Sequence, residues 1–469
     1  METQAAEPRF HQRQRKRSRS NSQFTGIDEE DKEQQHHHND QIRDPKTVTL
    51  PDDIIHNEIL TRLPPKHILR CRLVCKSWNS RFSTPDFINS HLTRQQNHPQ
   101  EEENLVIINK LIVPNGIQIL SRTTAIPLRN VPYIRHSLLG SINGLVALSC
   151  LQGKRFCLWN PAVGYLKFFP MPPSHSHPTK DQCNHFLGGF AWDHELNDYK
   201  LLLFCYDSAT SGPSQICVYS SNSAIWTTLR VPPHSGLPVG RILKSNLIMS
   251  PSTIVKGIPY WSYEKYLQLD GKRRRRKLIS TFKFLPQVNE FRVLPDLDAL
   301  KTGKNRFHIV NIKDGLFGMA YNVTGVKSLV DIYSLDDEES HCGGVWSKMY
   351  TVGPVDISYG GRQLSQCFKN GGDILIYGKR GPFNVYDPET GETKFVQSSD
   401  SGCLMACFNY TPSLVCVPGM ELMQESFTKE EGAFDVKLGC VFVSMLVLFR
   451  ICRDFELDDV DDGITSVTV

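Results

Sequence analysis

The stretch LPDDIIHNEILTRLPPKHILRCRLVCKSWNS, residues 50–80, decides how the first part of this 469-residue chain folds. Ile55, Ile59 and Leu63 recur at i, i+4 and i+8, which places them on one face of a helix. Pro64–Pro65 ends this helix and begins a second one, because proline is tolerated in a first helical turn. A segment this short cannot bury its apolar side chains alone, so we expect them to pack against another surface.

The second predicted helix carries two apolar stripes. They consist of Ile68, Cys71, Cys75 and Trp78, spaced i, i+3, i+7 and i+10, with Leu69 and Leu73 beside them. Thr84–Pro85 is a capping residue followed by proline, so a third helix is predicted to begin there. Because both stripes of the second helix are apolar, part of this surface is predicted to face something outside the helical unit.

From about residue 105 the sequence consists of short runs rich in aliphatic and aromatic residues, separated by Gly, Pro, Asn and Asp. This pattern predicts short β-strands joined by turns. A strand that ends in an aromatic and a small polar residue recurs at CLWN (157–160), CVYS (217–220), TFKF (281–284), DIYS (331–334) and NVYD (384–387). The spacing suits one four-stranded blade of a β-propeller, which must stack on neighbouring blades to cover its faces. Five copies are visible, and the start of the region can supply part of another. A two-sheet sandwich of similar strand content is the alternative.

Composition excludes several classes of protein. A formal net charge of +4 is too small for the chain as a whole to be an electrostatic nucleic-acid binder. Fourteen dispersed cysteines without a secretory signal predict reduced thiols in the cytosol or nucleus. The longest apolar run, CVFVSMLVLF at 440–449, is about half the roughly 20 residues that a membrane helix needs.

Residues 50–87 resemble an F-box. The matching positions are Leu50, Pro51, Ile54, Ile55, Ile59, Leu60, Leu63, Pro64, Leu73, Val74, Cys75, Lys76, Trp78, Pro85 and Phe87. The following region resembles the plant F-box-associated, kelch-like interaction domain. The matching stretches are GSINGLVAL (140–148), LWNPAVGYLKFFP (158–170), GGFAWDHELNDYKLLLF (188–204), VYSSNSAIWTTL (218–229) and VKGIPYWSY (255–263).

This resemblance, together with composition, predicts an α+β multidomain chain in which a three-helix F-box precedes an all-β, β-propeller-like domain. The expected limits are a disordered segment 1–46, an F-box 47–93, a linker 94–104, a β domain 105–417 and a tail 418–469. The tail does not match the repeat. Its apolar run is either a final strand that closes the ring of sheets or an interaction segment.

The resemblance implies the substrate-recognition subunit of a Skp–cullin–F-box E3 ubiquitin ligase, with no catalysis and no cofactor of its own. The F-box would bind a Skp-type adaptor, and through it a cullin and a RING protein, while the β domain would bind a target protein that the sequence leaves unidentified. The implied adaptor-binding residues are Leu50, Pro51, Ile54, Ile55, Ile59, Leu60, Leu63, Pro64, Val74, Cys75, Lys76 and Trp78, some of them internal core. Two alternatives stay open: a non-degradative F-box scaffold, and a propeller that binds a small molecule or sugar.

Two groups of histidines and cysteines have spacings that metal sites also use, but neither is expected to bind metal. His67, Cys71 and Cys75 would share a helix face without a fourth ligand, and the cysteines are better explained as core. The set His175, His177, Cys183 and His185 has no familiar zinc spacing and is expected to be a solvated loop.

Two basic runs, RQRKRSRS (13–20) and KRRRRK (272–277), are candidate nuclear-import signals, so the expected location is nucleus and cytoplasm. The second run is equally well explained as a solvated hairpin tip, and specific nucleic-acid binding is not expected from either run because no recognition element accompanies the charge.

The sequence contains no nucleophile elbow, phosphate-cradling glycine loop or paired metal motif. Asp193, His194 and Glu195 are adjacent, so their side chains diverge and are expected to be loop polar groups. Five tryptophans are expected to pack between blades: Trp159, Trp192, Trp226, Trp261 and Trp346.

Overall fold

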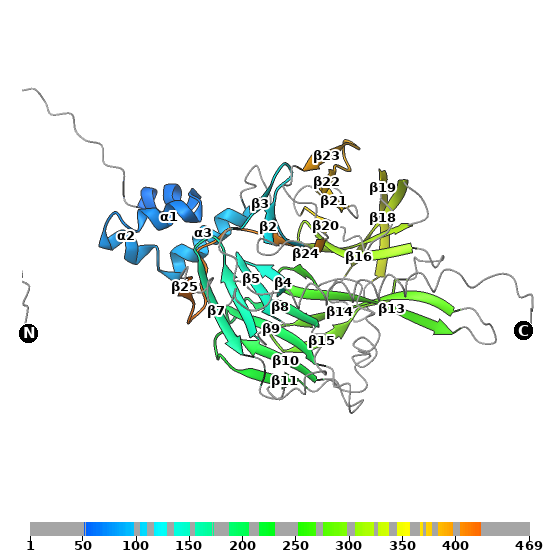
Figure 1. Cartoon of the computed structure of the whole chain (residues 1–469), viewed down its shortest axis with the longest axis horizontal. Helices are drawn as coiled ribbons and strands as arrows, with labels where there is room; N and C mark the ends of the chain where they lie inside the picture. The colour runs from blue at the N-terminus through cyan, green and yellow to red at the C-terminus, as the bar shows by residue number, and fades with distance from the viewer. Residues whose placement is uncertain are drawn as a thin grey trace, which may run out of the picture. The chain divides into compact units, whose positions relative to one another are not determined.

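The fold is taken from a computed structural model of the chain (Figure 1). It describes residues 51, 53–97, 104–109, 117–128, 136–150, 155–170, 172, 187–205, 215–229, 252–268, 275–297, 305–322, 327–336, 345–356, 366–368, 372–377, 383–396 and 404–423. The predicted disordered segment 1–46, the histidine-containing stretch 175–185 and the apolar run 440–449 lie outside these residues.

The described part of the chain begins with short helical elements, residues 54–97, which we name the helical segment. They are the π-helix η1 (Ile54–Ile59), the 3-10 helix η2 (Leu60–Arg62), and the α-helices α1 (Pro65–Cys71), α2 (Lys76–Arg81) and α3 (Pro85–Asn97). The prediction of one continuous second helix is wrong, because Cys75 is extended (φ −158°, ψ 166°) and separates α1 from α2. The break allows Trp78 to pack edge-on against His56 and Phe82, each with its ring centroid 5.7 Å from that of Trp78.

Helix α3 begins where the sequence predicts and ends later. The Thr84 hydroxyl accepts a hydrogen bond from the Phe87 amide (3.4 Å), as expected for a capping residue followed by Pro85. The helix extends beyond residue 93, where the helical unit was expected to end and a linker to begin. Its last turn is stabilised by tertiary contacts, because Arg94 forms an ion pair and Gln96 a hydrogen bond with residues far away in sequence.

The rest of the described chain forms six antiparallel sheets, numbered here as blades 1 to 6. Blade 1 is β24 (Leu404–Tyr410), β1 (Asn104–Asn109), β2 (Ile117–Leu120) and β3 (Ala125–Pro127). Blade 2 is β4 (His136–Ile142), β5 (Leu145–Cys150), β6 (Arg155–Asn160) and β7 (Tyr165–Pro170), with β25 (Glu421–Leu422) added at its edge. Blade 3 is β8 (Leu187–Asp193), β9 (Asp198–Cys205), β10 (Gln215–Ser220) and β11 (Trp226–Leu229).

The remaining blades follow the same order. Blade 4 is β12 (Thr253–Val255), β13 (Ile258–Gln268), β14 (Arg275–Leu285) and β15 (Glu290–Val293). Blade 5 is β16 (Asn305–Ile312), β17 (Gly315–Asn322), β18 (Lys327–Asp336) and β19 (Val345–Asp356). Blade 6 is β20 (Gln366–Cys367), β21 (Ile374–Tyr377), β22 (Phe383–Tyr386) and β23 (Thr393–Val396).

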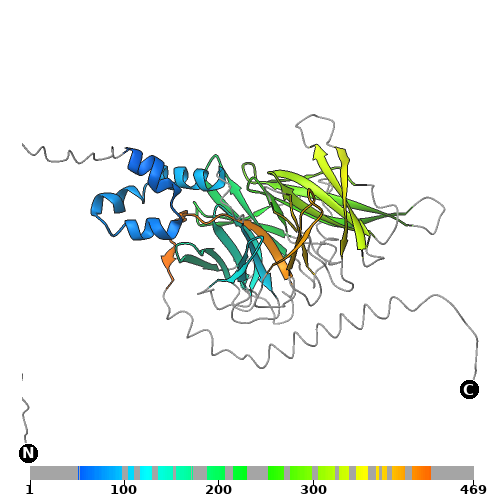
Figure 2. The same ribbon diagram turned by 90° about the horizontal axis from the view of Figure 1, so that it is seen from above.

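A strand from late in the chain closes the ring. β24 pairs with β1 in an antiparallel register that aligns Leu105 with Asn409 and Val106 with Phe408 (Figure 2). Among the described residues the closing strand is therefore β24. Six separate sheets exclude the two-sheet sandwich and confirm the propeller prediction.

The sequence repeat corresponds to one strand in each of blades 2 to 6. Its five copies lie on the third strands of blades 2 to 6, namely β6, β10, β14, β18 and β22. The aromatic residue of the repeat is buried at Trp159, Tyr219, Phe284 and Tyr386. The repeat therefore marks the strand that supplies aromatic packing between blades.

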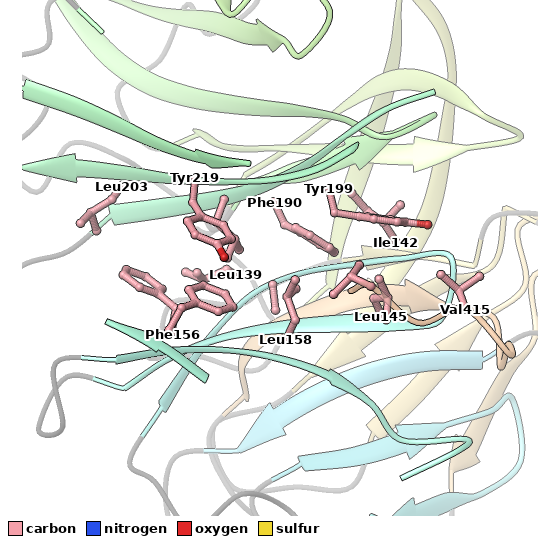
Figure 3. Close-up of a cluster of buried hydrophobic side chains, with 14 of the residues drawn as sticks. Leu139, Ile142, Leu145, Phe156, Leu158, Phe190, Tyr199, Leu203, Tyr219 and Val415 are labelled. Atoms are coloured by element: carbon pink, nitrogen blue, oxygen red, sulfur yellow. The ribbon is translucent and has the colours of Figure 1, made fainter. Parts of the chain in front are cut away.

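The core lies between neighbouring blades. Figure 3 shows side chains of blades 2 and 3 pointing toward one another, with Leu139, Phe156 and Leu158 facing Phe190 and Tyr219. Each blade is apolar on both faces and is covered only when it stacks on the next one.

Successive strands in a blade alternate in direction. The turns between first and second strands and between third and fourth strands therefore lie at one end of the blades, here named the turn face. Examples are residues 143–144 and 161–164 in blade 2 and 194–197 in blade 3. Connections between second and third strands lie at the opposite end, here named the far face.

Candidate functional site

Four aliphatic side chains of the helical segment are in contact with solvent. Their exposed fractions are 43% for Ile54, 43% for Ile59, 86% for Leu73 and 66% for Val74. A single exposed aliphatic residue is ordinary, but four in one short helical segment are typical of an interaction surface. We name these residues the exposed apolar set.

Leu73 and Val74 lie in the turn between α1 and α2. The Leu73 amide donates to the Arg70 carbonyl (3.1 Å) and the Val74 amide to the Cys71 carbonyl (3.1 Å), which closes the end of α1. Because Cys75 is then extended, the chain changes direction and leaves both aliphatic side chains outside the helical core.

The opposite side of these helices is buried against the propeller. One cluster joins side chains of the helices to side chains of blade 2 and of the segment after β24: Leu60, Ile68, Phe82, Phe87, Val163 and Leu414. Ile55, Leu63 and Trp78 pack against this cluster. Internal packing therefore buries these side chains and leaves the exposed apolar set uncovered.

An ion-pair network holds η1 against α3. Arg94 Nη2 lies 2.9 Å from Glu58 Oε2, and Arg62 Nη2 lies 3.3 Å from the same oxygen. Hydrogen bonds from Arg94 and then Arg62 lower the pKa of the Glu58 carboxyl below its usual range. Arg94 Nη1 also donates to the Asn57 carbonyl (3.0 Å). These contacts fix the position of the η1 members of the exposed apolar set.

A buried histidine fixes the chain just before the double proline. His91 Nε2 lies 2.8 Å from the Leu63 carbonyl oxygen, so the ring nitrogen donates to it. Burial lowers the pKa of His91, because the charged ring would lose its hydration there. The neutral ring therefore secures the position where η2 ends.

Helix α3 is also hydrogen-bonded to blade 2, and through blade 2 it is linked to blade 3. Gln96 Nε2 donates to Asn143 Oδ1 (3.1 Å), and Asn143 Nδ2 donates to the Tyr199 hydroxyl (3.0 Å). Asn143 lies in the turn of blade 2 and Tyr199 on β9 of blade 3. Ile88 and Leu92 pack in the cluster between the same blades. The helical segment is therefore joined to the turn face of the propeller.

The structure divides the predicted adaptor-binding residues into groups. Those that are exposed are Pro51, Ile54, Ile59, Pro64, Val74, Cys75 and Lys76. Those that are partly or fully buried in the internal cluster are Ile55, Leu60, Leu63 and Trp78. Leu50 lies outside the described residues.

Sequence reasoning omitted Leu73 from the predicted contact set. Among the described residues it is the most exposed aliphatic side chain of the helical segment. The signal was present, because Leu73 is one of the positions that resemble an F-box and lies on the second stripe. The stripe pattern alone did not single it out from Leu69, its partner on that stripe.

Within the described part of the chain, the histidines and cysteines whose spacing resembles a metal site are not brought together. Since α1 ends at Cys71 and Cys75 is extended, His67, Cys71 and Cys75 do not share one helix face. No group of three His, Cys, Asp or Glu side chains in the described ranges is arranged to hold a metal ion.

The acidic turn of blade 3, which contains Asp193, has a structural role. Asp193 Oδ1 accepts hydrogen bonds from the amides of Glu195 (3.1 Å) and Leu196 (3.2 Å), as in an Asx-type turn. Lys200 Nζ lies 3.6 Å from Asp193 Oδ2 and also donates to Asn289 Oδ1 (3.0 Å) in blade 4. The turn therefore links two blades, which agrees with the expectation of loop polar groups.

The five tryptophans pack as expected. Trp159 and Trp261 are buried members of inter-blade clusters. Trp192, Trp226 and Trp346 pack against such clusters while partly exposed.

Among the helices of the described ranges, none combines the length and apolar composition required to cross a membrane.

Comparison with known proteins agrees with this architecture. Residues 106–417 match the model of the F-box associated beta propeller domain, and residues 49–90 match the F-box domain. A putative F-box protein of Arabidopsis thaliana is 23% identical over 410 residues, covering 78% of this chain and 94% of the relative. A second F-box protein of that plant is 26% identical over 331 residues, covering 66% of this chain and 80% of the relative. A shorter match, to putative F-box only protein 10 of the same species, is 30% identical over 138 residues, covering 29% and 36%.

Proposed function

Because the chain belongs to the family with an F-box and an F-box associated β-propeller domain, we propose that it is a substrate-recognition subunit of a Skp–cullin–F-box ubiquitin ligase. An F-box implies binding to a Skp-type adaptor. The family points to a non-catalytic adaptor role, in which the chain connects the ligase to a target protein.

The exposed apolar set carries this proposal. Four aliphatic side chains remain uncovered after the helical segment has packed against its own propeller. A specific interface of standard size covers about 800 Å² on each partner and has an apolar centre. Ile54, Ile59, Leu73 and Val74 supply such a centre for the adaptor.

The predicted contact residues then separate into two roles. Exposed Pro51, Pro64, Cys75 and Lys76 are proposed to contact the adaptor around the exposed apolar set. Ile55, Leu60, Leu63 and Trp78 are proposed to support the shape of that surface from beneath, because they pack in the internal cluster. Truncating a supporting residue would weaken adaptor binding by distorting the surface rather than by removing a contact.

The chain needs no chemistry of its own in this role. A target bound to the propeller is kept near the ubiquitin-charged enzyme, which raises the effective concentration of its lysines. The bonds from Gln96 to Asn143 and from Asn143 to Tyr199 support this role by connecting the adaptor-binding helices to the propeller.

Co-purification of the full chain with a Skp-type adaptor tests the proposal. Leu73→Asp with Val74→Asp should reduce adaptor affinity at least about tenfold, because charge would be buried at the centre of the interface. The matched control is Leu196→Asp with Ile225→Asp, at propeller turn residues of similar exposure, 65% and 60%. Equal adaptor retention by both double variants would contradict the proposal.

A turnover assay separates ligase function from a non-degradative scaffold. A captured partner should accumulate when cullin activity is inhibited, and should do so only with the form that retains the adaptor. A partner whose abundance is unchanged by that inhibition would favour the scaffold.

We also propose a distribution between nucleus and cytoplasm. Its support is the pair of basic runs at 13–20 and 272–277, of which Arg275, Arg276 and Lys277 lie on β14. Replacing the arginines and lysine of 13–20 with alanine in a fluorescent fusion should lower the nuclear fraction. An unchanged distribution would show that this run does not direct import.

A further inference from the structure

The helical segment carries positive charge that the rest of the chain does not. It contains seven Lys and Arg residues but only two Asp and Glu residues, a net charge of +5. The formal net charge of the whole chain is +4, so all other residues taken together carry a net charge of −1. The positive excess of this protein therefore belongs to the same short segment that carries the exposed apolar set.

Four of the basic side chains are exposed and have no acidic partner in the described ranges. They are Lys66, Arg70, Lys76 and Arg81, which we name the exposed basic set. The ion pairs of the helical segment use other residues, since Glu58 is bound by Arg62 and Arg94. Between residues 59 and 85 the sequence contains no Asp or Glu. The positive charge of the exposed basic set is therefore not neutralised within its own segment.

Three members of the exposed basic set border the turn that exposes Leu73 and Val74. Lys66, Arg70 and Leu73 are spaced by four and then three residues, so they lie along one side of α1 and the turn that continues it. The hydrogen bond from the Leu73 amide to the Arg70 carbonyl (3.1 Å) shows this continuation. Lys76 begins α2 two residues after Val74. The most exposed aliphatic side chains of the segment are thus bordered by positive charge on both sides in sequence.

The fourth member lies beside the other half of the exposed apolar set. Arg81 Nη2 donates a hydrogen bond to Asn57 Oδ1 at 3.5 Å. Asn57 lies in η1 between Ile54 and Ile59, the two η1 members of the exposed apolar set. Exposed cations therefore accompany both the η1 part and the turn part of this apolar surface.

We propose that the exposed basic set selects the adaptor by charge, so that the adaptor surface covering the exposed apolar set carries Asp and Glu around its apolar centre. This inference rests on the proposed function, because it takes the adaptor as the occupant of the surface. It adds Lys66, Arg70 and Arg81 to the contact region, none of which is among the positions that resemble an F-box. Complementary charge around an apolar centre fixes register, speeds association and opposes partners of the wrong charge.

The same charge decides against two other occupants. A second copy of this chain would bring two positive surfaces together, which costs free energy. A nucleic acid would neutralise the cations with its phosphates, but a phosphate backbone offers no apolar surface to cover Ile54, Ile59, Leu73 and Val74. An acidic protein surface with an apolar centre satisfies both sets of side chains.

The two sets of side chains should act on different steps of binding. Charges at the margin of an interface mainly change the rate of association and its dependence on salt. Apolar side chains at the centre mainly change the rate of dissociation, because their contacts form only in the docked complex. A kinetic measurement therefore separates the exposed basic set from the exposed apolar set.

The test measures association and dissociation of the full chain with an immobilised Skp-type adaptor by biolayer interferometry. Salt is set at about 0.1 M and about 1 M, where charges are screened over roughly 10 Å and 3 Å. The test variant is Lys66→Glu with Arg70→Glu and Lys76→Glu. The control is Lys256→Glu with Lys313→Glu and Lys394→Glu, at exposed positions of blades 4, 5 and 6, which makes the same change in charge.

A milder variant guards against misfolding of the test variant. Lys66→Gln with Arg70→Gln and Lys76→Gln removes the three charges without introducing repulsion between glutamates on one helix. Its association rate at low salt should lie between those of the control and the test variant. A glutamine variant as fast as the control would overturn the proposal even if the glutamate variant proved unfolded.

The expected result is an association rate at least about tenfold lower for the test variant than for the control at low salt. The difference should fall below about twofold at high salt, and the dissociation rates should differ less than the association rates. Equal association of test variant and control at low salt would overturn the proposal. Faster association of the test variant would show that the adaptor surface is positively charged, which also overturns it.

Three further outcomes would assign the surface to another occupant and so overturn the proposal. One is binding of duplex DNA that is tighter than binding of the adaptor and is lost in the test variant. Another is a dimer of the wild-type chain that the test variant does not form. The third is adaptor binding at least about tenfold tighter after removal of residues 424–469, which contain the acidic run RDFELDDVDD (453–462).

Failure of this inference can be told apart from failure of the proposed function. Adaptor binding that depends neither on salt nor on the exposed basic set would refute the inference and leave the proposed function intact. Absence of adaptor binding by wild type at both salt concentrations would refute the proposed function, and the inference with it.

Discussion

The helical segment and the propeller differ in where their apolar side chains are placed. In the blades the repeat aromatics Trp159, Tyr219 and Phe284 are buried between neighbouring sheets. In the helical segment Leu73 and Val74 are exposed although the helices have already packed against the propeller. The ring of blades completes its own core by closing on itself. The helices leave the exposed apolar set uncovered, and this is the surface that we propose the adaptor covers.

The largest loss of stability is expected from a substitution inside the propeller. Trp261 is fully buried and its ring stacks on Phe282 at a centroid distance of 5.2 Å. Trp261→Ala should lower the free energy of unfolding by about 3–5 kcal/mol, through lost burial and a cavity. Chemical denaturation of the full chain measures this loss. A loss below about 1 kcal/mol would mean that the inter-blade core does not support the ring as described.

The next largest loss of stability is expected at the bond between blades 2 and 3 that positions Asn143 for its contact with Gln96 of the helical segment. Tyr199→Phe removes the hydroxyl that accepts a hydrogen bond from the buried Asn143 amide. Leaving that donor without a partner should cost about 1–3 kcal/mol. Tyr219→Phe is the control, since no hydrogen bond of its hydroxyl is described. Equal destabilisation by the two substitutions would indicate a lost packing contact and no contribution from the bond.

The stability of the helical segment should depend on pH through the titration of His91. Its pKa is lowered by burial, so the folded chain binds fewer protons than the unfolded chain below the ordinary value of 6.5. Stability should therefore be complete above that value and fall as the pH drops below it. Unfolding of wild type and His91→Gln at pH 7.5 and 5.5 measures the effect. Glutamine keeps a donor for the Leu63 carbonyl and cannot titrate, so its stability should change less. The same acid sensitivity in both would assign the effect to other groups.

The smallest effect on stability should come from the exposed apolar set. Val74→Ala should change the free energy of unfolding by no more than about 0.5 kcal/mol, because the side chain is 66% exposed. The same substitution should weaken adaptor binding measurably, since an interface centre is sensitive to lost apolar contact. If Val74→Ala instead destabilised the chain as much as a core substitution, the difference between the two regions would disappear.

Much of the architecture was readable from the sequence because it depends on neighbours along the chain. Thr84–Pro85 predicted the start of α3, since capping and proline geometry are local. The recurring strand predicted blades, because short apolar runs at blade-like spacing indicate strands that are covered on both faces. The F-box positions predicted an apolar surface, but not which of its residues would face outward.

The remaining features depend on contacts between distant residues. The break at Cys75 allows Trp78 to reach His56 and Phe82, which no periodicity along the helix indicates. The last turn of α3 exists because Arg94 finds Glu58 and Gln96 finds Asn143. Helix periodicity placed Leu73 on an apolar stripe without deciding whether it faces inward, and the turn before α2 exposes it.

Taken by itself, the sequence determined the kinds of element, their order and the presence of surplus apolar surface in residues 50–80. The tertiary structure alone decided that β24 closes the ring with β1 and that Leu60 lies inside while Val74 lies outside. The physical reason is that propensity and periodicity act over a few residues. Burial is settled by which surfaces meet, and those surfaces come from residues far apart in the chain.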